Sequence, residues 1–225
     1  MKERRKIPII LFFLLYLVLA WASLWQWGSP EPGSRIDLFS GGFFAATPLW
    51  LGEYAVFLKS IGPTREVRQE AIGATYDPAM TKWVTALSLA EMAIFIDYSH
   101  WRLVPALENT PLQSVGLALW FLIPGWLLWA DLHLGRHFSD ENWPSRLVTG
   151  GPFRYVRHPR YAGLLASRIA FYLLFASAVG WLFGVGWLLL VAKRIRLEEA
   201  HLRQHYGADY DVYASTTPRL LPGIY

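Results

Sequence analysis

Two short stretches of the sequence carry residues that could bind a polar ligand. The first is LVTGGPFRYVRHPRYAG, residues 147–163, and the second is the acidic pair Glu198-Glu199. Pro159 disfavours a helical conformation at the preceding His158, so a new helix should begin just after it, and Gly150-Gly151-Pro152 predicts a turn. Backbone amides at such a helix start, with histidine and tyrosine side chains nearby, suit a ligand that carries a carboxylate or a ribose.

The acidic pair lies in KRIRLEEAHL, residues 193–202, which predicts a helix that continues out of an apolar segment. Arg194 and Glu198 are four residues apart and therefore lie on one face of that helix. One of the two glutamates could meet a ligand ammonium group or ribose hydroxyls. The same residues also fit a helix end at which long basic side chains reach toward water and pair with acids. The spacing by itself leaves both interpretations open.

The composition indicates where these residues must be held. The chain has 225 residues, of which 54% are hydrophobic and 17% charged, and it contains 12 Trp and no Cys. The apolar residues form long runs, which is typical of a polytopic membrane protein. The absence of cysteine excludes disulfides, thiolate chemistry and cysteine-ligated metal sites. The net charge is +4, but the basic residues flank the apolar runs and form no continuous stripe. This argues against nucleic-acid binding.

The apolar runs predict an all-α, polytopic membrane helix bundle with a short C-terminal helical hairpin. The first run follows a basic start and is longer than the apolar core of a signal peptide, so we expect a spanning helix there. The last two runs are each short for a span and are separated by Gly180, which favours a hairpin over one long tilted helix. The six runs are residues 7–27, 43–61, 83–107, 112–132, 162–179 and 181–192.

The basic residues predict the topology of this bundle. Residues 1–6, 59–82, 136–160 and 193–225 hold 18 of the 21 Lys and Arg. Under the positive-inside rule these pieces, and both termini, lie in the cytoplasm. We expect two parts, N-terminal transmembrane helices over 1–110 and a C-terminal core with the chemistry over 111–225. The short loops favour a bacterial inner membrane, or the endoplasmic reticulum in a eukaryote, with the site on the cytoplasmic face.

Glu53, Glu91, Asp97 and Arg168 are ionisable residues that lie inside the apolar runs. Such residues are costly in a membrane and tend to face the interior of the bundle. We expect Arg168 to pair with Glu91 or Glu53, because all three should lie at a similar depth. Alternatively, Arg168 receives an acidic headgroup of a substrate. Asp97 should be an interfacial polar residue.

The motif RHPRYAG, followed by an apolar hairpin and then EE, resembles the signature of the isoprenylcysteine carboxyl methyltransferase family. That family belongs to a wider group of membrane methyltransferases that includes phospholipid-methylating enzymes. The resemblance continues through LVTGGPFRYVRHPRYAG and through the ending EEAHLRQHYGADYDVYASTTPRLLPGI. The sequence departs from the family at His137, where related chains often carry Asn, and at Arg168, where small or apolar residues are usual. Both departures affect the expected methyl acceptor more than the donor.

The resemblance implies S-adenosylmethionine as the methyl donor, bound in the C-terminal half. We expect no metal site. The cofactor residues that it implies are His158, Pro159, Tyr161, Gly163, Glu198, Glu199 and the backbone of Leu147, Val148 and Gly150. Charge and position add the catalytic candidates Arg157 and Arg194, with Glu199, and the substrate candidates Arg154, Arg168 and Glu91. Arg154, Arg157 and Arg160 also fit a role as anchors of the membrane topology.

The expected function is transfer of a methyl group from S-adenosylmethionine to a lipophilic acceptor within or at the membrane. A carboxylate acceptor, such as a prenylcysteine-type C-terminus, needs no general base, and an arginine would orient it. A protonated amine acceptor, as in a phospholipid N-methyltransferase, needs a base, for which Glu199 and His158 are candidates. A non-catalytic membrane protein that keeps the fold is the further alternative. The expected partners are a lipophilic or lipidated acceptor and membrane lipid.

Overall fold

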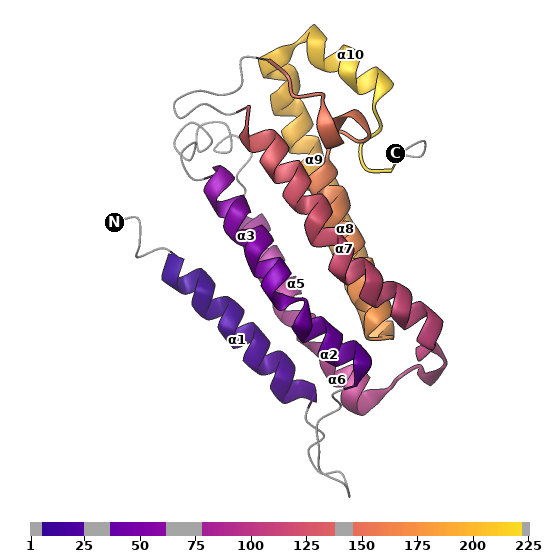
Figure 1. The fold of residues 1–225 in the computed structure, drawn as a ribbon. Coiled ribbons are helices and arrows are strands. Elements are labelled where there is room, and N and C mark those ends of the chain that lie inside the picture. Colours follow the sequence, from indigo (N-terminus) through magenta and orange to yellow (C-terminus); the bar gives the residue numbers. More distant parts are fainter. Residues whose placement is uncertain (1–5, 25–36, 62–77, 138–145, 222–225) are drawn as a thin grey trace, which may run out of the picture.

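The fold is known from a computed structural model of the chain, which describes residues 6–24, 37–61, 78–137 and 146–221. These ranges are helical without any strand, which confirms the all-α prediction (Figure 1). The α-helices are α1 (Lys6–Leu24), α2 (Leu38–Ala45), α3 (Thr47–Ile61), α5 (Pro78–Ala90), α6 (Met92–Ile96), α7 (Thr110–Gly135), α8 (Pro159–Leu174), α9 (Ala178–Tyr206) and α10 (Ala208–Thr216). A π-helical turn covers Asp97–Trp101, and short 3₁₀ turns cover Pro105–Leu107 and Gly151–Arg154.

Two of these helices, α7 and α9, are long and apolar enough to cross a membrane. The basic ends of α3 and α7 lie at the same end of the bundle as α10, at the top of Figure 1. The six-span topology and the cytoplasmic position of the termini stay predictions. Residues 1–5 and 222–225, which hold the termini, lie outside the described residues.

The C-terminal hairpin is formed by α8 and α9, which exclude a single long helix over 162–192. The predicted break near Gly180 was wrong, because the turn lies at residues 175–177 and α9 has already begun at residue 178. Ser177 caps α9 by accepting a hydrogen bond from the Gly180 amide, and the preceding Ala176 has a left-handed φ of 47°. The second arm is also not short, since α9 has 29 residues.

Three other boundaries differ from the predicted runs. The second run is interrupted at Ala46, between α2 and α3. The third begins earlier, at Pro78, and its α- and π-helical part ends at Trp101. α10 was not predicted, because its polar sequence has no apolar periodicity.

Asp97, expected at the interface, is only 2% exposed and accepts hydrogen bonds from the Ser177 hydroxyl and the Leu103 amide.

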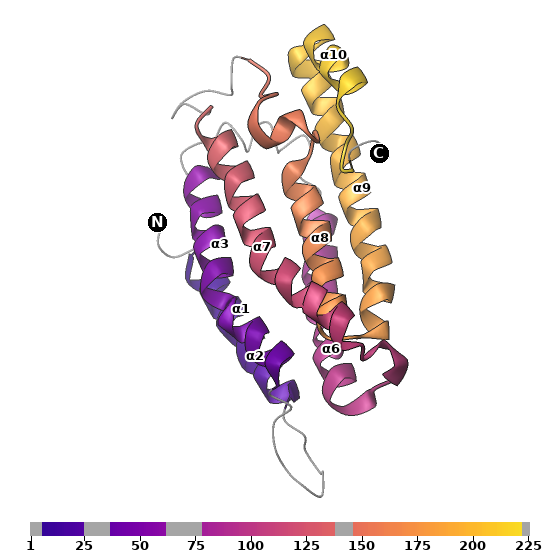
Figure 2. The same ribbon diagram turned by 45° about the vertical axis from the view of Figure 1, so that its right-hand side comes forward.

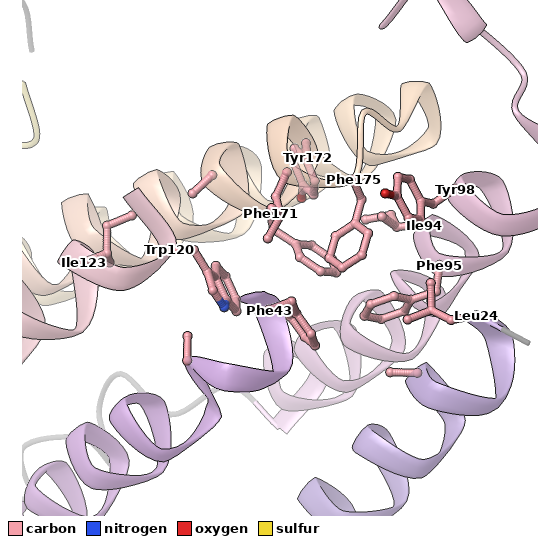
Figure 3. Close-up of a cluster of buried hydrophobic side chains, with 14 of the residues drawn as sticks. Leu24, Phe43, Ile94, Phe95, Tyr98, Trp120, Ile123, Phe171, Tyr172 and Phe175 are labelled. Carbon is pink, nitrogen blue, oxygen red and sulfur yellow. The ribbon is translucent and has the colours of Figure 1, made fainter. Parts of the chain in front are cut away.

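Aromatic side chains form the core between the N-terminal helices and the hairpin (Figure 3). Phe43 of α2 stacks on Trp120 of α7, with ring centroids 5.3 Å apart, and Phe95 of α6 meets Phe175 edge to face at 4.9 Å. Phe171 of α8 contacts Phe43, Phe95, Trp120 and Phe175. Offset and edge-to-face contacts of this kind add to the burial of apolar area. The core therefore joins helices from both parts of the chain.

Close packing of α7 against α8 positions the site (Figure 2). At one end, Gly116 of α7 lies so near α8 that a Cβ there would be 2.5 Å from the Leu174 backbone nitrogen. At the other end, Nε1 of Trp126 donates a 2.7 Å hydrogen bond to the carbonyl of Pro159. Small residues let helices in a membrane approach closely. The first turn of α8 is therefore held at a defined place against α7.

Candidate functional site

The sequence stretch around His158 folds as predicted. His158 has φ −124° and ψ 64°, and α8 begins at Pro159 directly after it. Gly151 has a φ of +57° and starts a 3₁₀ turn, which confirms the turn expected at Gly150-Gly151-Pro152. The first amides of α8 have no intrahelical acceptor, as at every helix start, and the positive end of the helix dipole favours a negatively charged group there.

The segment after α10 returns to this helix start. The amide of Arg157 donates to the carbonyl of Pro218 at 2.8 Å, and the amide of His158 donates to that of Arg219 at 3.0 Å. We call residues 217–221 the C-terminal strap. It joins the end of the chain to the entrance of α8, near the charged end of α9 (Figure 2).

Glu199 is the centre of a buried charge cluster with Arg157, Arg219 and His158. Its side chain is 1% exposed. Arg219 donates to Oε1 at 3.1 Å and to Oε2 at 3.0 Å, and Oε1 also accepts from Arg157 at 2.9 Å. Nε2 of His158 lies 3.4 Å from Oε1. Two arginines on one carboxylate make charge-assisted bonds that are stronger than neutral ones.

Glu199 lies in the charged end of α9, beyond the apolar part of that helix. Its ionisation is set by burial and by the three partners named above. Burial raises the pKa of this carboxyl, but hydrogen bonds from His158 and Arg219 and the charge of Arg157 outweigh burial and hold its pKa far below the usual range. Glu199 therefore stays ionised at neutral pH. A carboxylate with so low a pKa is a poor proton acceptor.

Arg157 and Arg219 connect this cluster to the rest of the C-terminal region. Nη1 of Arg157 also donates to the carbonyls of Ala214 and Thr217, at 2.5 and 2.6 Å. No role was predicted for Arg219, although it lies in the PRLLP sequence of the ending that carries the family resemblance. The sequence therefore held a hint of its importance. Only the folding of the strap back onto the start of α8 shows that Arg219 reaches Glu199.

The other acid of the pair, Glu198, meets Tyr161 of the RHPRYAG motif, whose residues His158, Pro159, Tyr161 and Gly163 form the pattern HPxYxG. The Tyr161 hydroxyl donates to Oε2 of Glu198 at 2.8 Å and accepts from Nε of Arg194 at 3.3 Å. The four-residue spacing of Arg194 and Glu198 thus brings both to one hydroxyl. The two glutamates differ in role, because Glu199 holds the chain together and Glu198 lies beside the motif tyrosine.

A cavity of about 930 Å³ opens beside this tyrosine. It lies between α1, α3 and α5 on one side and α7, α8 and α9 on the other, and most of its lining is apolar. Tyr161 and Arg194 line one region of it, and Glu91 and Arg168 line another. Ligand sites in proteins are mostly apolar cavities of this size with a few placed polar groups.

The structure shows which basic residues pair with Glu91 and Glu53, the two acids considered as partners of Arg168. Arg168 lies 3.1 Å from Oε2 of Glu91, which confirms one of the two expected pairings. Glu53 instead pairs with Arg160, at 2.9 Å, and Asp131 also contacts Arg160. Arg157 and Arg160 are therefore not mere topology anchors, because each is held by buried carboxylates. Asp131 was missed, since it resembled the polar end of an apolar run.

The remaining candidates lie around this arrangement. Val148 is buried, Leu147 is half-buried and Gly150 is exposed. Gly163 packs so closely on α7 that a Cβ would lie 2.6 Å from the Leu127 side chain, so it serves helix packing. Arg154 is exposed, and its guanidinium lies 5.2 Å from the ring centroid of its neighbour Tyr155.

The polar groups near the start of α8 fit a ligand with a carboxylate and ribose hydroxyls, as S-adenosylmethionine has. Besides the helix amides and Glu198, Nε2 of His133 is buried without a hydrogen-bond partner within the described residues. It lies beside the turn, 3.5 Å from where a Cβ on Gly150 would be. A buried polar atom usually has a partner, so a donor or acceptor of a bound ligand would complete this one.

Comparisons with known proteins agree with the motif. The family model for phospholipid methyltransferases matches residues 114–209. A probable protein-S-isoprenylcysteine O-methyltransferase of Oryza sativa subsp. indica is 32% identical over 89 residues, which are 39% of this chain and 45% of that protein. The protein-S-isoprenylcysteine O-methyltransferase of Schizosaccharomyces pombe is 33% identical over 87 residues, 38% of this chain and 37% of that protein.

A longer match reaches into the N-terminal helices. The methanethiol S-methyltransferase of Mycobacterium tuberculosis is 27% identical over 160 residues, 61% of this chain and 62% of that protein. The chain spans less than half the length of the first relatives that it matches. Over its C-terminal half, this helical chain with two membrane-compatible helices resembles the isoprenylcysteine carboxyl methyltransferase family.

Proposed function

We propose that this chain is an integral membrane methyltransferase that uses S-adenosylmethionine to methylate a lipophilic acceptor. One observation carries the proposal: Tyr161 belongs both to the HPxYxG motif and to the wall of the large apolar cavity. The donor site that the motif implies and a site for a lipophilic molecule therefore share this residue. The matched family and relatives, which are named as methyltransferases, support the same reaction class.

When bound, S-adenosylmethionine would supply an electrophilic sulfonium methyl group. The helix amides at the start of α8, Glu198 and His133 would bind its polar groups. His158, Arg157 and Glu199 would hold the strap and the helix start in place around it. Much of the barrier to a displacement at carbon can be lowered by alignment alone, so these residues need only position the reactants.

We propose a carboxylate as the acceptor, oriented by Arg194 beside Tyr161. An oxygen of the carboxylate forms the new bond to the methyl carbon while the bond from sulfur to that carbon breaks, so no proton has to be removed. The low pKa of Glu199 supports this choice, because it makes one of the two bases considered for an amine acceptor a poor proton acceptor. The large cavity also argues against a one-carbon thiol, which would leave most of it unfilled.

The test uses the full chain in lipid nanodiscs with methyl-labelled S-adenosylmethionine. Calorimetry should show binding of S-adenosylmethionine or S-adenosylhomocysteine, and His158→Ala should weaken it. Membrane lipids and prenylcysteine analogues then serve as acceptors. Label that base releases as methanol marks a methyl ester and supports the carboxylate, whereas base-stable label marks N-methylation and overturns that choice.

Two results would contradict the reaction class itself. One is the absence of any binding of donor or product by a folded protein. The other is binding without methyl transfer to any lipid extract, which would favour a non-catalytic membrane protein. Arg203→Ala is a matched control, because the side chain of Arg203 is exposed and, among the described residues, contacts Asp211 and the edge of the C-terminal region at the Tyr210 ring. It should leave donor binding unchanged.

A further inference from the structure

The two arms of the hairpin present matching stripes to the cavity. On α8 the stripe is Tyr161, Leu164, Leu165 and Arg168, and on α9 it is Trp187, Leu190, Val191 and Arg194. In both stripes the positions follow the i, i+3, i+4, i+7 spacing, which keeps them on one helix face. Because the arms are antiparallel, Arg194 meets Tyr161 at one end, and Arg168 lies over the Trp187 ring at the other, 4.3 Å from its centroid.

The stripes therefore make two polar layers with apolar side chains between them. Seven helical residues separate Tyr161 from Arg168, which corresponds to about 10 Å along α8. The first layer is the proposed site of methyl transfer. The second layer, Arg168 with Glu91 and Trp187, lines a mostly apolar cavity and has no part in that chemistry.

Oε1 of Glu91 has two hydrogen-bond partners, whereas its Oε2 has only the ion pair with Arg168 within the described residues. Oε1 of Glu91 accepts from the Tyr172 hydroxyl at 2.8 Å and from Nε1 of Trp187 at 2.9 Å. Arg168 has its ion pair with Glu91 and its contact with the Trp187 ring, but no hydrogen bond within the described residues. A guanidinium has five N–H donors. Its side chain is 23% exposed and lines the cavity, so those donors can reach a ligand.

The charge of this layer limits what it can bind. Arg168 and Glu91 together are neutral, so a second carboxylate there would be an uncompensated charge in a medium of low dielectric. A neutral oxygen accepts hydrogen bonds from the guanidinium without that cost. This argues against the acidic headgroup considered for Arg168 from the sequence.

We propose that the second layer recognises a neutral oxygen group, such as a carbonyl, hydroxyl or ether, on the apolar body of the methyl acceptor. This inference rests on the proposed function and narrows its substrate class: the acceptor is an oxygenated lipophile, with the oxygen about 10 Å from the atom that is methylated. A plain hydrocarbon chain would leave the donors of Arg168 without acceptors.

The experiment compares two isomeric probes, S-dodecyl-N-acetylcysteine with a keto group about 10 Å from the carboxylate and the same compound with the keto group at roughly half that distance. Their dissociation constants are measured by calorimetry with the protein in nanodiscs. Since one hydrogen bond contributes about 1 kcal/mol, the far isomer should bind wild type roughly fivefold more tightly. Methyl transfer to the two isomers should show the same preference.

Two variants separate recognition from folding. Glu91→Gln combined with Arg168→Leu removes both charges and leaves an acceptor for Tyr172 and Trp187, so it should fold, bind S-adenosylmethionine normally and lose the preference. Arg168→Lys keeps a charged donor and should retain part of it. Equal binding of the isomers by wild type, or binding of neither, in protein that binds S-adenosylmethionine overturns the inference. Wild-type protein that is folded but does not bind S-adenosylmethionine overturns the proposed function instead.

Discussion

Two glutamates of this protein, Glu199 and Glu91, are each 1% exposed and each paired with arginine, yet their surroundings differ. Glu199 is held by two arginines and a histidine that come from the α8 entrance and the strap. Glu91 has one arginine, and its oxygen Oε1 accepts from a tyrosine and a tryptophan.

Burial of a charge therefore does not by itself indicate its role. The partners of Glu199 are also bonded to the backbone of the strap and of α10, so this cluster holds chain segments together. Arg168, the partner of Glu91, faces the cavity and has N–H donors that make no hydrogen bond within the described residues. Completed sets of hydrogen bonds indicate structure, and incomplete ones at a cavity wall indicate a ligand.

The largest expected effect is on the first cluster. Glu199→Gln would leave Arg157 buried without its counter-charge, and breaking a buried pair typically costs about 3–5 kcal/mol. We expect a large loss of stability and of S-adenosylmethionine binding, measured by thermal unfolding and calorimetry in detergent. Asp211→Asn, which breaks an exposed pair with Arg203, is the control and should cost under about 1 kcal/mol. Equal losses in both variants would show that the Glu199 cluster does not hold the region together.

Tyr161→Phe should change activity more than stability. The variant loses a hydroxyl that joins Glu198 and Arg194 but keeps the ring. Hydrogen bonds to charged groups contribute about 1.5–3 kcal/mol, so methyl transfer should fall roughly 10- to 100-fold. Wild-type turnover by this variant would remove the link between the motif and the cavity.

The pH dependence of stability tests whether the ionised Glu199 stabilises the fold. Because the folded-state pKa of Glu199 lies below its ordinary value of 4.5, its stabilisation is fully present above that value and is lost as the pH falls. The stability difference between wild type and Glu199→Gln should be constant from about pH 8 to 6 and shrink below about pH 4.5, by up to about 1.4 kcal/mol per pH unit. Chemical denaturation at each pH measures it, and a difference that shrinks already near pH 7 would contradict the assigned cause.

The smallest effect is expected at Arg154. It is exposed and contacts only the Tyr155 ring within the described residues. Arg154→Ala should alter both unfolding temperature and methyl transfer by little, under about 0.5 kcal/mol. A tenfold loss of turnover would instead place this arginine at the acceptor, as its charge and position suggested.

The sequence alone was enough for the helical class, for the start of α8 at Pro159 and for the pairing of Arg168 with an acid of the apolar runs. These depend on local chemistry: proline constrains its predecessor, apolar runs need helices, and a charge in an apolar run needs a partner. The same local rules misplaced the hairpin turn. Glycine disrupts helices more than serine does, so Gly180 was chosen as the turn. In the structure Ser177 is the N-cap of α9, three residues before Gly180, and its hydroxyl donates to the distant Asp97.

Only the tertiary structure decided which charges are structural and which face a ligand. Arg157 and Arg160 look alike in sequence, and so do Glu198 and Glu199, yet their partners come from segments far away in the chain. Arg219 reaches Glu199 only because the strap folds back, and Arg168 faces a cavity only because two antiparallel stripes meet. Such contacts depend on the register of packed helices, which residue types and spacings within one segment do not encode.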